Sequence, residues 1–572
     1  MERRLLLVFA LTFLVILAFQ PILKKYLPQA PPPQTQSPAQ AQPANVPTPS
    51  AVQPAVAAPA VASGEHASAE SETVIENDLY RIVFTNRGAQ VKSWILKKFD
   101  DGKGHPLELV NSAAAPQYGY PMSLWTYDET TRNKLNSELY VSSASGSVQT
   151  PGSISFEYSD GDLAVRKSFS FDDSYVVHVA TSVVAKGSIV SALPAWPSGF
   201  GDDNENGSSA YAAGKIEYQN GANVERLTYK KVSGGATVSG PFNWAAVSDQ
   251  YFTAAFLPDQ PQNFTLVTLH NALEIPKDTH DPKPNETVKV SVLGAAVGNL
   301  HGPTEERVFV GPKALQTLES VHVAGMPANV EADLRQLVDF GWLGVIARPL
   351  FAWLRWTHDH IVANWGWAIV VQTLIITLAL LPLRISSMKS ALKMAKIQPQ
   401  MNAIKEKYKK YSLRDPRRQE MNTEIGALMK EEGVSPVGGC LPLIIQMPFL
   451  FAYYRMLGVA LDLRHAHWLW IHDLSSRDPL FILPALLVVS MIATQRMTPQ
   501  AGMDPQQQKM MNWTMPLMMG FIFFNLAAGL NLYYSESNLI MIAQQAVMNR
   551  TKLGREMREL QEKRARKKDK DK

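Results

Sequence analysis

The sequence of 572 residues contains a single cysteine, Cys440, so no disulfide can form within the chain. It has neither the Cys/His spacing of a zinc site nor the GxxxxGK(S/T) loop that binds nucleotide phosphates. The formal net charge is only +4, and hydrophobic residues make up an ordinary 46%. These absences exclude a disulfide-stapled scaffold and a P-loop nucleotide hydrolase. We therefore predict no catalytic residue, no cofactor and no metal, and turn to where the apolar and charged residues are placed.

Apolar residues gather in long runs, the first of which ends at Phe19. Arg3 and Arg4 precede it, an arrangement found in signal peptides and in uncleaved signal anchors. Because no small-residue cleavage site follows closely, we predict a transmembrane anchor over residues 1–27, although Ala-rich sequence further on leaves cleavage open. Residues 28–71 are mostly Pro, Ala, Gln and Ser and cannot bury enough apolar surface to fold, which predicts a disordered linker.

Short strand-like segments fill residues 72–325. The clearest lie on either side of the turn Ser159-Asp160-Gly161-Asp162, where apolar and polar residues alternate. Many short strands separated by Gly, Asn and Asp turns predict a large antiparallel β-sandwich. If the anchor crosses the membrane, this domain lies outside the cytoplasm.

Residues 330–361 change to helical periodicity, with apolar residues three and four positions apart. Trp residues at the edges, together with Arg348 and Arg355, favour an amphipathic helix lying in the membrane interface. A helix packed on the β-sandwich is the alternative.

Five further apolar runs predict membrane spans, because each approaches the roughly 20 residues that cross the hydrocarbon core. Lys and Arg are concentrated in residues 384–436 and in the tail at 548–572, whereas residues 459–479 hold only Arg464 and Arg477. By the positive-inside rule the two basic segments are cytoplasmic and the poorly charged loop faces outward. The spans are 365–383, 438–458, 480–497, 513–528 and 530–547, with 498–512 as a second cytoplasmic loop.

The predicted fold class is thus an α-helical polytopic membrane protein with six spans, a five-helix core, both termini in the cytoplasm and a large periplasmic β-sandwich. Residues 384–436 read as a basic, Met-rich helical hairpin that can contact emerging apolar peptides or the anionic leaflet, or can simply join two spans. The basic tail predicts binding to RNA or to anionic lipids.

Three sequence segments resemble the conserved core of the YidC/Oxa membrane-protein insertases: GGCLPLIIQMP, WIHDLSSRDPLFILP and LNLYYSESNLIMIAQQ. The resemblance implies a periplasmic supersandwich domain and a five-helix core with a hydrophilic groove that opens to cytoplasm and lipid but is closed toward the periplasm. It also implies insertion of nascent membrane proteins into the cell inner membrane without ATP, by a monomer that works alone or with the Sec translocon and the ribosome.

The sequence departs from the family at one position. A groove Arg usually lies on the first core span, and its place here is taken by Thr377. Two replacements are conceivable: Arg384, seven residues on and about 10 Å away on the same helix face, and Arg455 on the next span. Glu536 is an unusual intramembrane acid, and we hypothesise that it pairs with Arg455, since each charge is costly alone in lipid.

A wet groove shortens the path that polar segments must take through hydrocarbon, where each unpaired backbone group costs several kcal/mol. Polar side chains in the spans predict its lining, although hydrogen bonding between helices is the alternative role for each of them. The predicted groove residues are Gln372, Thr373, Thr377, Gln446, Tyr533 and Tyr534.

Two other classes of function remain open at this stage. A secondary transporter or channel favours two repeated halves, into which five core spans do not divide. A membrane-tethered carbohydrate-binding protein would use the β domain instead.

Overall fold

The computed structural model describes residues 64–102, 104–201, 214–276, 287–327, 330–411, 415–434, 441–497 and 510–560, without the side chains of residues 276 and 441–446. The predicted anchor at 1–27, most of the linker, most of the loop at 498–512 and the last part of the tail lie outside these residues.

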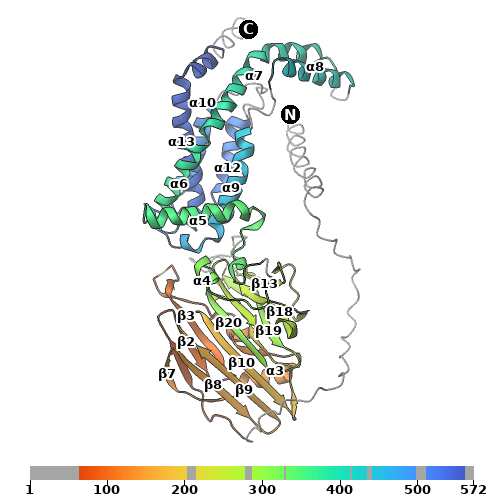
Figure 1. Ribbon diagram of the computed structural model, residues 1–572, viewed down its shortest axis with the longest axis vertical. Helices are drawn as coiled ribbons and strands as arrows, with labels where there is room; N and C mark the ends of the chain where they lie inside the picture. Colours follow the sequence, from red (N-terminus) through yellow and green to blue (C-terminus); the bar gives the residue numbers. More distant parts are fainter. Residues whose placement is uncertain are drawn as a thin grey trace. The chain divides into compact units, whose positions relative to one another are not determined.

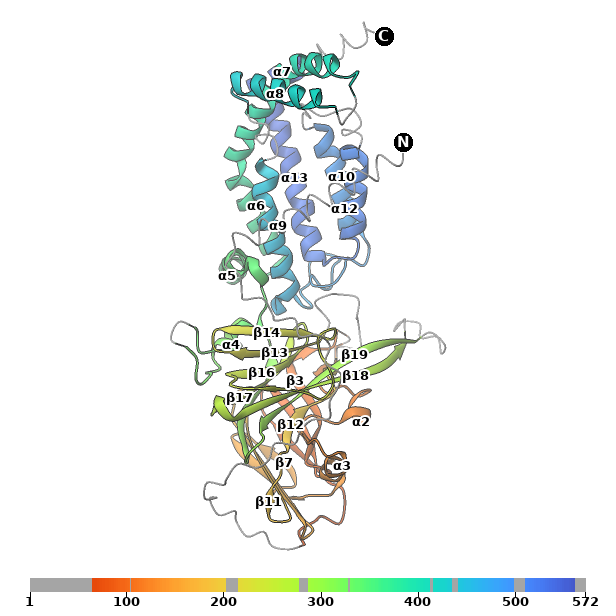
Figure 2. The same cartoon turned by 90° about the vertical axis from the view of Figure 1, so that its right-hand side faces the viewer.

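Within the described residues, the strands of the β domain form three sheets (Figures 1 and 2). All the strand pairs are antiparallel except β1 with β7. The first sheet has the order β4 (Pro106–Glu108), β3 (Gln90–Asp100), β2 (Tyr80–Thr85), β1 (Glu72–Glu76), β7 (Gly146–Gln149). The second runs β14 (Asn223–Thr228), β13 (Lys215–Asn220), β16 (Trp244–Ser248), β17 (Phe252–Pro258), β20 (Thr304–Pro312), β10 (Val176–Ala185), β9 (Leu163–Phe171), β8 (Gly152–Ser159), β6 (Val141–Ser142), with β11 (Ser188–Ile189) beside β10. The third has the order β15 (Ala236–Ser239), β18 (Phe264–Pro276), β19 (Thr287–Asn299), β12 (Leu193–Trp196), β5 (Ser123–Trp125).

The hairpin of β8 and β9 shows why these residues form strands. Alternate residues of both strands are buried, as a half-buried strand requires. In the turn, Asp160 accepts a hydrogen bond from the Leu163 amide at 2.8 Å, and Gly161 has a φ of +94° that favours glycine. Phe84 of β2 packs on Phe169 of β9 at 4.8 Å, which joins the first and second sheets through their apolar faces. The predicted β-rich domain is confirmed.

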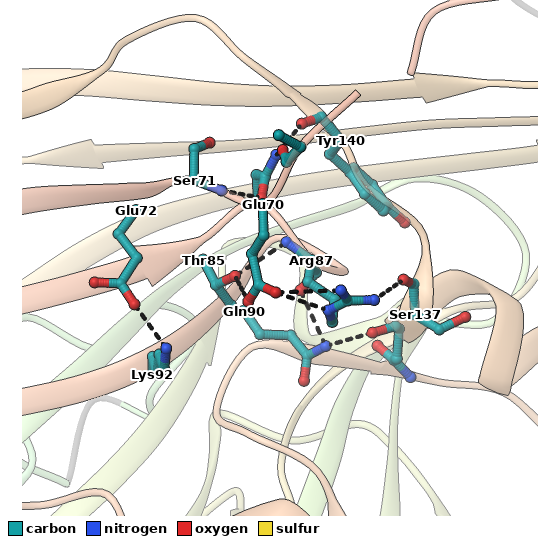
Figure 3. Close-up of polar contacts among 12 residues, drawn as sticks. Glu70, Ser71, Glu72, Thr85, Arg87, Gln90, Lys92, Ser137 and Tyr140 are labelled. Carbon is teal, nitrogen blue, oxygen red and sulfur yellow. Dashed lines mark hydrogen bonds and ion pairs between the residues drawn. The ribbon is translucent and has the colours of Figure 1, made fainter. Parts of the chain in front are cut away.

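The chain enters the β domain earlier than the linker prediction over 28–71 allows. Figure 3 shows Glu70 beside Arg87, whose guanidinium forms an ion pair with it at 3.1 Å and donates to the Ser137 carbonyl. Ser71 donates its amide to the Asn86 side chain, and Ala67 donates its amide to Leu139. The linker boundary at residue 71 is therefore too late, because hydrogen bonds to distant strands order residues that composition alone marks as unfolded.

Lys167 is a fully buried cation in the β domain, on the inward face of β9. Its ammonium donates to three backbone carbonyls, those of Gly88 at 3.0 Å, Ala89 at 2.6 Å and Met122 at 2.5 Å. Three acceptors match the three N–H groups of a lysine and link β9 to the first sheet. Burial nevertheless lowers the pKa of Lys167 to about 7, because the charged form loses its hydration.

We expect this lysine to make the stability of the β domain depend on pH. Between pH 7 and about 10.4, the unfolded chain binds a proton on Lys167 that the folded chain lacks, so stability rises with pH. Relative to Lys167→Met, the native protein should gain up to about 1.4 kcal/mol per pH unit in that window. Urea unfolding of both proteins at pH 7, 8 and 9 measures the difference. Lys92→Met, at an exposed ion pair with Glu72, is the control and should show no such trend; parallel curves for Lys167→Met would contradict the expectation.

The predicted helix over 330–361 begins only at Gly344. Residues before it form two short 3-10 turns, η3 (Arg335–Leu337) and η4 (Gly341–Leu343), and α5 follows at Gly344–His360. Leu334, Leu337 and Val338 are buried without belonging to a helix, which explains why apolar spacing alone placed the start too early. The remaining short elements are α2 (Ala115–Tyr118), α3 (Glu129–Ser137), α4 (Leu315–Glu319), η2 (Pro261–Asn263) and η5 (Leu461–Leu463).

The C-terminal region is helical. Its elements are α6 (Trp365–Ala379), α7 (Leu381–Lys407), α8 (Arg417–Glu431), α9 (Leu441–Val459), α10 (Ile482–Met497), the π turn η6 (Met510–Thr514), α12 (Met515–Phe523) and α13 (Ala528–Arg550). By length and hydropathy, no single helix among the described residues is long and apolar enough to cross a membrane. Residues Gly341–His360 and Trp365–Ala379 meet that test only together, as a pair bent by 120°. The six spans and the five-helix core therefore stay predictions.

Residues 552–560, at the start of the basic tail, are helical and pack against α7. Met557 lies in an apolar cluster with Leu392 and Ala395, and Lys396 forms an ion pair with Glu556 at 2.6 Å. The beginning of the tail is thus held beside the first helix of the basic hairpin.

Candidate functional site

Polar residues on the facing sides of α13 and of α6 with the start of α7 form one band, which we call the polar stripe. On α13 the stripe contains Tyr533, Glu536 and Gln544, whose spacings of three and eight residues keep them on one helix face. Thr373 and Thr377, one turn apart, face them from α6. Figure 2 shows α6, α9 and α13 alongside one another. The rest of α6 is apolar, so its polar side, which faces α13, is a distinct feature of that helix.

The end of this stripe nearest α5 is closed. Gln372 is completely buried, donates to the Leu350 carbonyl of α5 at 3.0 Å, and accepts a hydrogen bond from the Tyr453 hydroxyl of α9. Tyr453 in turn stacks on Tyr533 of α13, with ring centroids 4.1 Å apart. Four helices, α5, α6, α9 and α13, are thereby joined at one level, and the side chains of Gln372 and Tyr533 serve as hydrogen-bonding and packing groups between helices.

The loop after α9 covers the same end. Trp468 is 8% exposed and packs edge-on against Trp367 at 5.8 Å. Asp478 accepts the backbone amides of Leu480 at 3.0 Å and Leu483 at 2.7 Å, which caps the start of α10. Trp468 thus packs on the start of α6, and Asp478, within the segment WIHDLSSRDPLFILP, fixes the start of α10.

Toward the other end, the stripe is only half-buried. Gln544 donates to the Thr377 carbonyl at 3.2 Å and accepts from the Arg384 guanidinium at 3.1 Å. Arg384 lies on α7, because α6 ends at Ala379 and α7 begins at Leu381, yet it stays on the polar side as its seven-residue distance from Thr377 predicts. Thr377, where the resemblance leads one to expect an Arg, is therefore neutral, and the nearest cation of this site is Arg384, seven residues further along the chain.

Glu536 lies between the closed and the half-buried parts. Thr373, which is completely buried and donates to the Ile369 carbonyl at 2.7 Å, also hydrogen-bonds the Glu536 carboxyl. The second carboxyl oxygen, Oε2, is buried and has no hydrogen-bond partner among the described residues. A carboxyl with an unused oxygen inside an apolar bundle is unusual, because such groups are costly to bury.

The predicted pairing of Arg455 with Glu536 is wrong. The Arg455 guanidinium instead forms an ion pair with Asp339 at 2.7 Å and also donates to the Asp339 carbonyl. Burial would raise the pKa of Asp339, but the charges of Arg226 and Arg455 outweigh it and hold the pKa below its usual value. Arg455 thus connects α9 to the segment that leaves the β domain.

Two predicted groove residues remain to be placed. Tyr534 is half-buried and packs edge-on against Phe523 of α12 at 4.8 Å, so it points toward a different helix than Tyr533 does. The side chain of Gln446 lies outside the described residues.

Sequence reasoning missed Tyr453, Gln544 and Asp339. Gln544 lies eight residues after Glu536, and helical periodicity was a sufficient signal for it. Tyr453 and Asp339 have no comparable signal, since each is recognised only through a partner on another element, Gln372 and Arg455 respectively. Among the described residues, no cluster of His, Cys, Asp and Glu has the arrangement to hold a metal ion.

Comparison with known proteins identifies the family. The family model described as "YidC periplasmic domain" matches residues 72–353, and that described as "60Kd inner membrane protein" matches residues 356–570. The membrane protein insertase YidC of Bordetella avium is 30% identical over 507 residues, which cover 84% of this chain and 83% of the relative. That of Burkholderia cenocepacia strain J2315 is 33% identical over 494 residues, covering 83% and 84%.

A crystal structure of an active YidC insertase with its first transmembrane domain resolved aligns over 85% of this chain and 95% of the solved chain, with 19% identity and a TM-score of 0.34. Both curated relatives are named insertases, not transporters or carbohydrate-binding proteins. With two family descriptions that together span the β domain and the helical region, the chain belongs to the YidC family of membrane protein insertases.

Proposed function

We propose that this protein inserts membrane proteins through a hydrated groove bounded by the polar stripe of α6, α7 and α13. In this proposal the anchor and five core helices span the inner membrane, with both termini in the cytoplasm and the β domain in the periplasm. The observation that supports it is the gradient of burial along the stripe. Gln372 and Thr373 are sealed at 0% exposure beside α5, whereas Thr377, Arg384 and Gln544 are half-buried toward the cytoplasmic hairpin.

A groove closed at one end suits the energetics of insertion. An unpaired backbone polar group in hydrocarbon costs several kcal/mol, so a short polar segment cannot cross the lipid unaided. Water and polar side chains that reach part-way through the bilayer shorten the dry path, while a closed outer end keeps the membrane sealed. Tyr534 and Gln446 are further proposed lining residues, and Arg384 is the proposed cation of this site.

The surface of α5 supports its placement in the membrane interface. Its buried side includes Leu350 and Leu354. The opposite side leaves Val345 87% and Trp356 51% exposed, and Trp342 of the preceding turn η4 is 86% exposed. Such exposure is costly in water but suits the boundary between headgroups and acyl chains. We propose the same setting for the positively charged hairpin of α7 and α8, which would contact ribosomes, emerging apolar chains and anionic lipids. The Sec translocon as a partner and a monomeric state remain predictions.

Site-specific crosslinking tests the groove. Photoreactive residues at Thr377 and Tyr534 of the full-length protein should capture ribosome-bound nascent chains of a single-spanning membrane protein. The control position is Val489 on α10, which is 65% exposed and should capture them less. If positions 377 and 534 reacted only with neighbouring helices of the same chain, these side chains would be interhelical contacts and the groove would have no support.

A further inference from the structure

The charge pattern of the bundle singles out one residue. In the sequences of α6, α9, α10, α12 and α13, Glu536 is the only acidic residue. It lies on the polar stripe at the boundary between the sealed and the half-buried parts. Its carboxyl forms a hydrogen bond with the Thr373 hydroxyl, and its other oxygen is buried with no partner in the part of the chain that the structure describes.

Among the described residues, no cation on these helices forms an ion pair with Glu536. Arg455 is paired with Asp339 at 2.7 Å, and Arg496 lies over the Trp513 ring at 5.1 Å. Arg550 is 14 residues further along α13, about 21 Å by helix rise. Arg384, at the start of α7, donates to Gln544, two helical turns away from Glu536. The bundle thus contains an acid for which the described residues supply no counter-ion.

A purely structural role does not explain the unused oxygen. Contact with Thr373 needs only one polar atom of residue 536, which an amide side chain would provide without the cost of burying an ionisable group. A carboxyl gains over an amide when a charged donor approaches it, since hydrogen bonds to ionised groups are roughly twice as strong as neutral ones. Glu536 as a whole is half-buried and faces the half-buried part of the stripe, so a charged donor from outside the chain can approach its carboxyl, with Oε2 covered until that donor arrives.

Resting on the proposed insertase function, we propose that Glu536 is a specificity-determining residue that binds ammonium and guanidinium groups of the segment being translocated. Lysine and arginine side chains, and a free N-terminal amine, belong to this class. The site thereby selects for positively charged translocated segments and against acidic ones, because a carboxylate repels like charge. Arg384 lies closer to the cytoplasmic hairpin, where it bonds Gln544, so it does not compete with a substrate cation for the Glu536 carboxyl.

The test uses full-length protein in liposomes and a single-spanning substrate with a short translocated N-terminal tail. Three versions of the tail carry one central Lys, Asp or Gln. The native protein should insert the Lys tail more efficiently than the Asp tail by on the order of tenfold, the effect expected of one charge-assisted hydrogen bond. In Glu536→Gln the Lys-to-Asp ratio should fall close to one, and in Glu536→Asp, which keeps the carboxylate, the preference should return. Glu157→Gln on β8 is the matched control and should keep the native ratio.

The outcomes separate the two proposals. If the native protein inserted none of the three tails, the proposed function itself would fail. If it inserted the Gln tail but treated the Lys and Asp tails alike, the insertase would stand and the role of Glu536 would be refuted. The same refutation follows if Glu536→Gln retains the native preference, because the ratio is independent of how much folded variant is present.

Discussion

A protein in which Thr377 and Gln544 are both replaced by leucine is expected to insert substrates with polar translocated tails at least about tenfold more slowly than the native protein. The Gln544 side chain donates to the backbone carbonyl of Thr377, which places both side chains in the half-buried part of the stripe between α6 and α13. Leucine removes the Thr377 hydroxyl and the Gln544 amide, which accepts a hydrogen bond from Arg384. It also adds apolar volume, which excludes water from the proposed groove. Since tenfold corresponds to about 1.4 kcal/mol, the loss of a single partner for a backbone group in transit is enough to produce it.

The comparison is sharpest with two substrates. A substrate whose spans need no polar segment to cross should be inserted by the Thr377→Leu/Gln544→Leu protein at close to the native rate. The matched control is Leu378→Thr, which changes the neighbouring, 49% exposed residue of α6 and should leave insertion of both substrates unchanged. Equal slowing of both substrates by the double variant would point to damaged packing and not to a lost polar path. An unchanged rate with polar tails would contradict the proposed groove.

Replacing Gly366 by leucine is expected to destabilise the closed end of the bundle by about 3 kcal/mol or more, because overpacking a filled site forces neighbours to move. A Cβ on Gly366 would lie 2.2 Å from the ring of Trp468, which covers the start of α6. Trp468 is held by Trp367 and Trp470 on either side, so the ring has little freedom to withdraw. Thermal unfolding in detergent, followed by tryptophan fluorescence, measures the loss.

A double variant separates the steric effect from other causes. In Gly366→Leu/Trp468→Ala the clash is relieved, and the destabilisation should be smaller than the sum of the two single variants by about 2 kcal/mol. Gly426→Leu is the control, because a Cβ there meets no atom within 4 Å, and it should be neutral or slightly stabilising in helix α8. Additive single effects would show that Gly366 and Trp468 do not compete for the same space.

The strongest sequence predictions concern features that neighbouring residues decide together. The alternation in β8 and β9 identifies a hairpin because the buried face of a strand repeats every two residues. Helical spacing likewise places Arg384 on the same side as Thr377, and the contact of both with Gln544 follows. The same reasoning fails at residues 330–343, where apolar residues are spaced as in a helix but fold as two short turns against other elements.

The partners of charged groups could not be predicted from the spacing of residues in the sequence. Arg455 and Asp339 are 116 positions apart, and nothing in the spans indicates that the counter-ion of Arg455 lies outside them. Pairing with Glu536 follows from the free-energy cost of leaving either charge alone in lipid. In the structure, however, Arg455 has the Asp339 carboxylate at 2.7 Å. Lys167 is a similar case, because its three acceptors are backbone carbonyls, which every residue possesses.

By itself, the sequence determined that a strand-rich domain precedes apolar helices with polar residues among them, and that basic segments alternate with poorly charged ones. These properties depend on short-range periodicity and on local charge, which the order of residues contains directly. Only the tertiary structure decided that Gln372 and Tyr533 are buried between helices and that Arg455 connects α9 to Asp339. It also decided that one oxygen of Glu536 has no partner among the residues that the structure describes. Each of these depends on which distant atoms fill the space around a side chain, and that is settled by packing, not by sequence spacing.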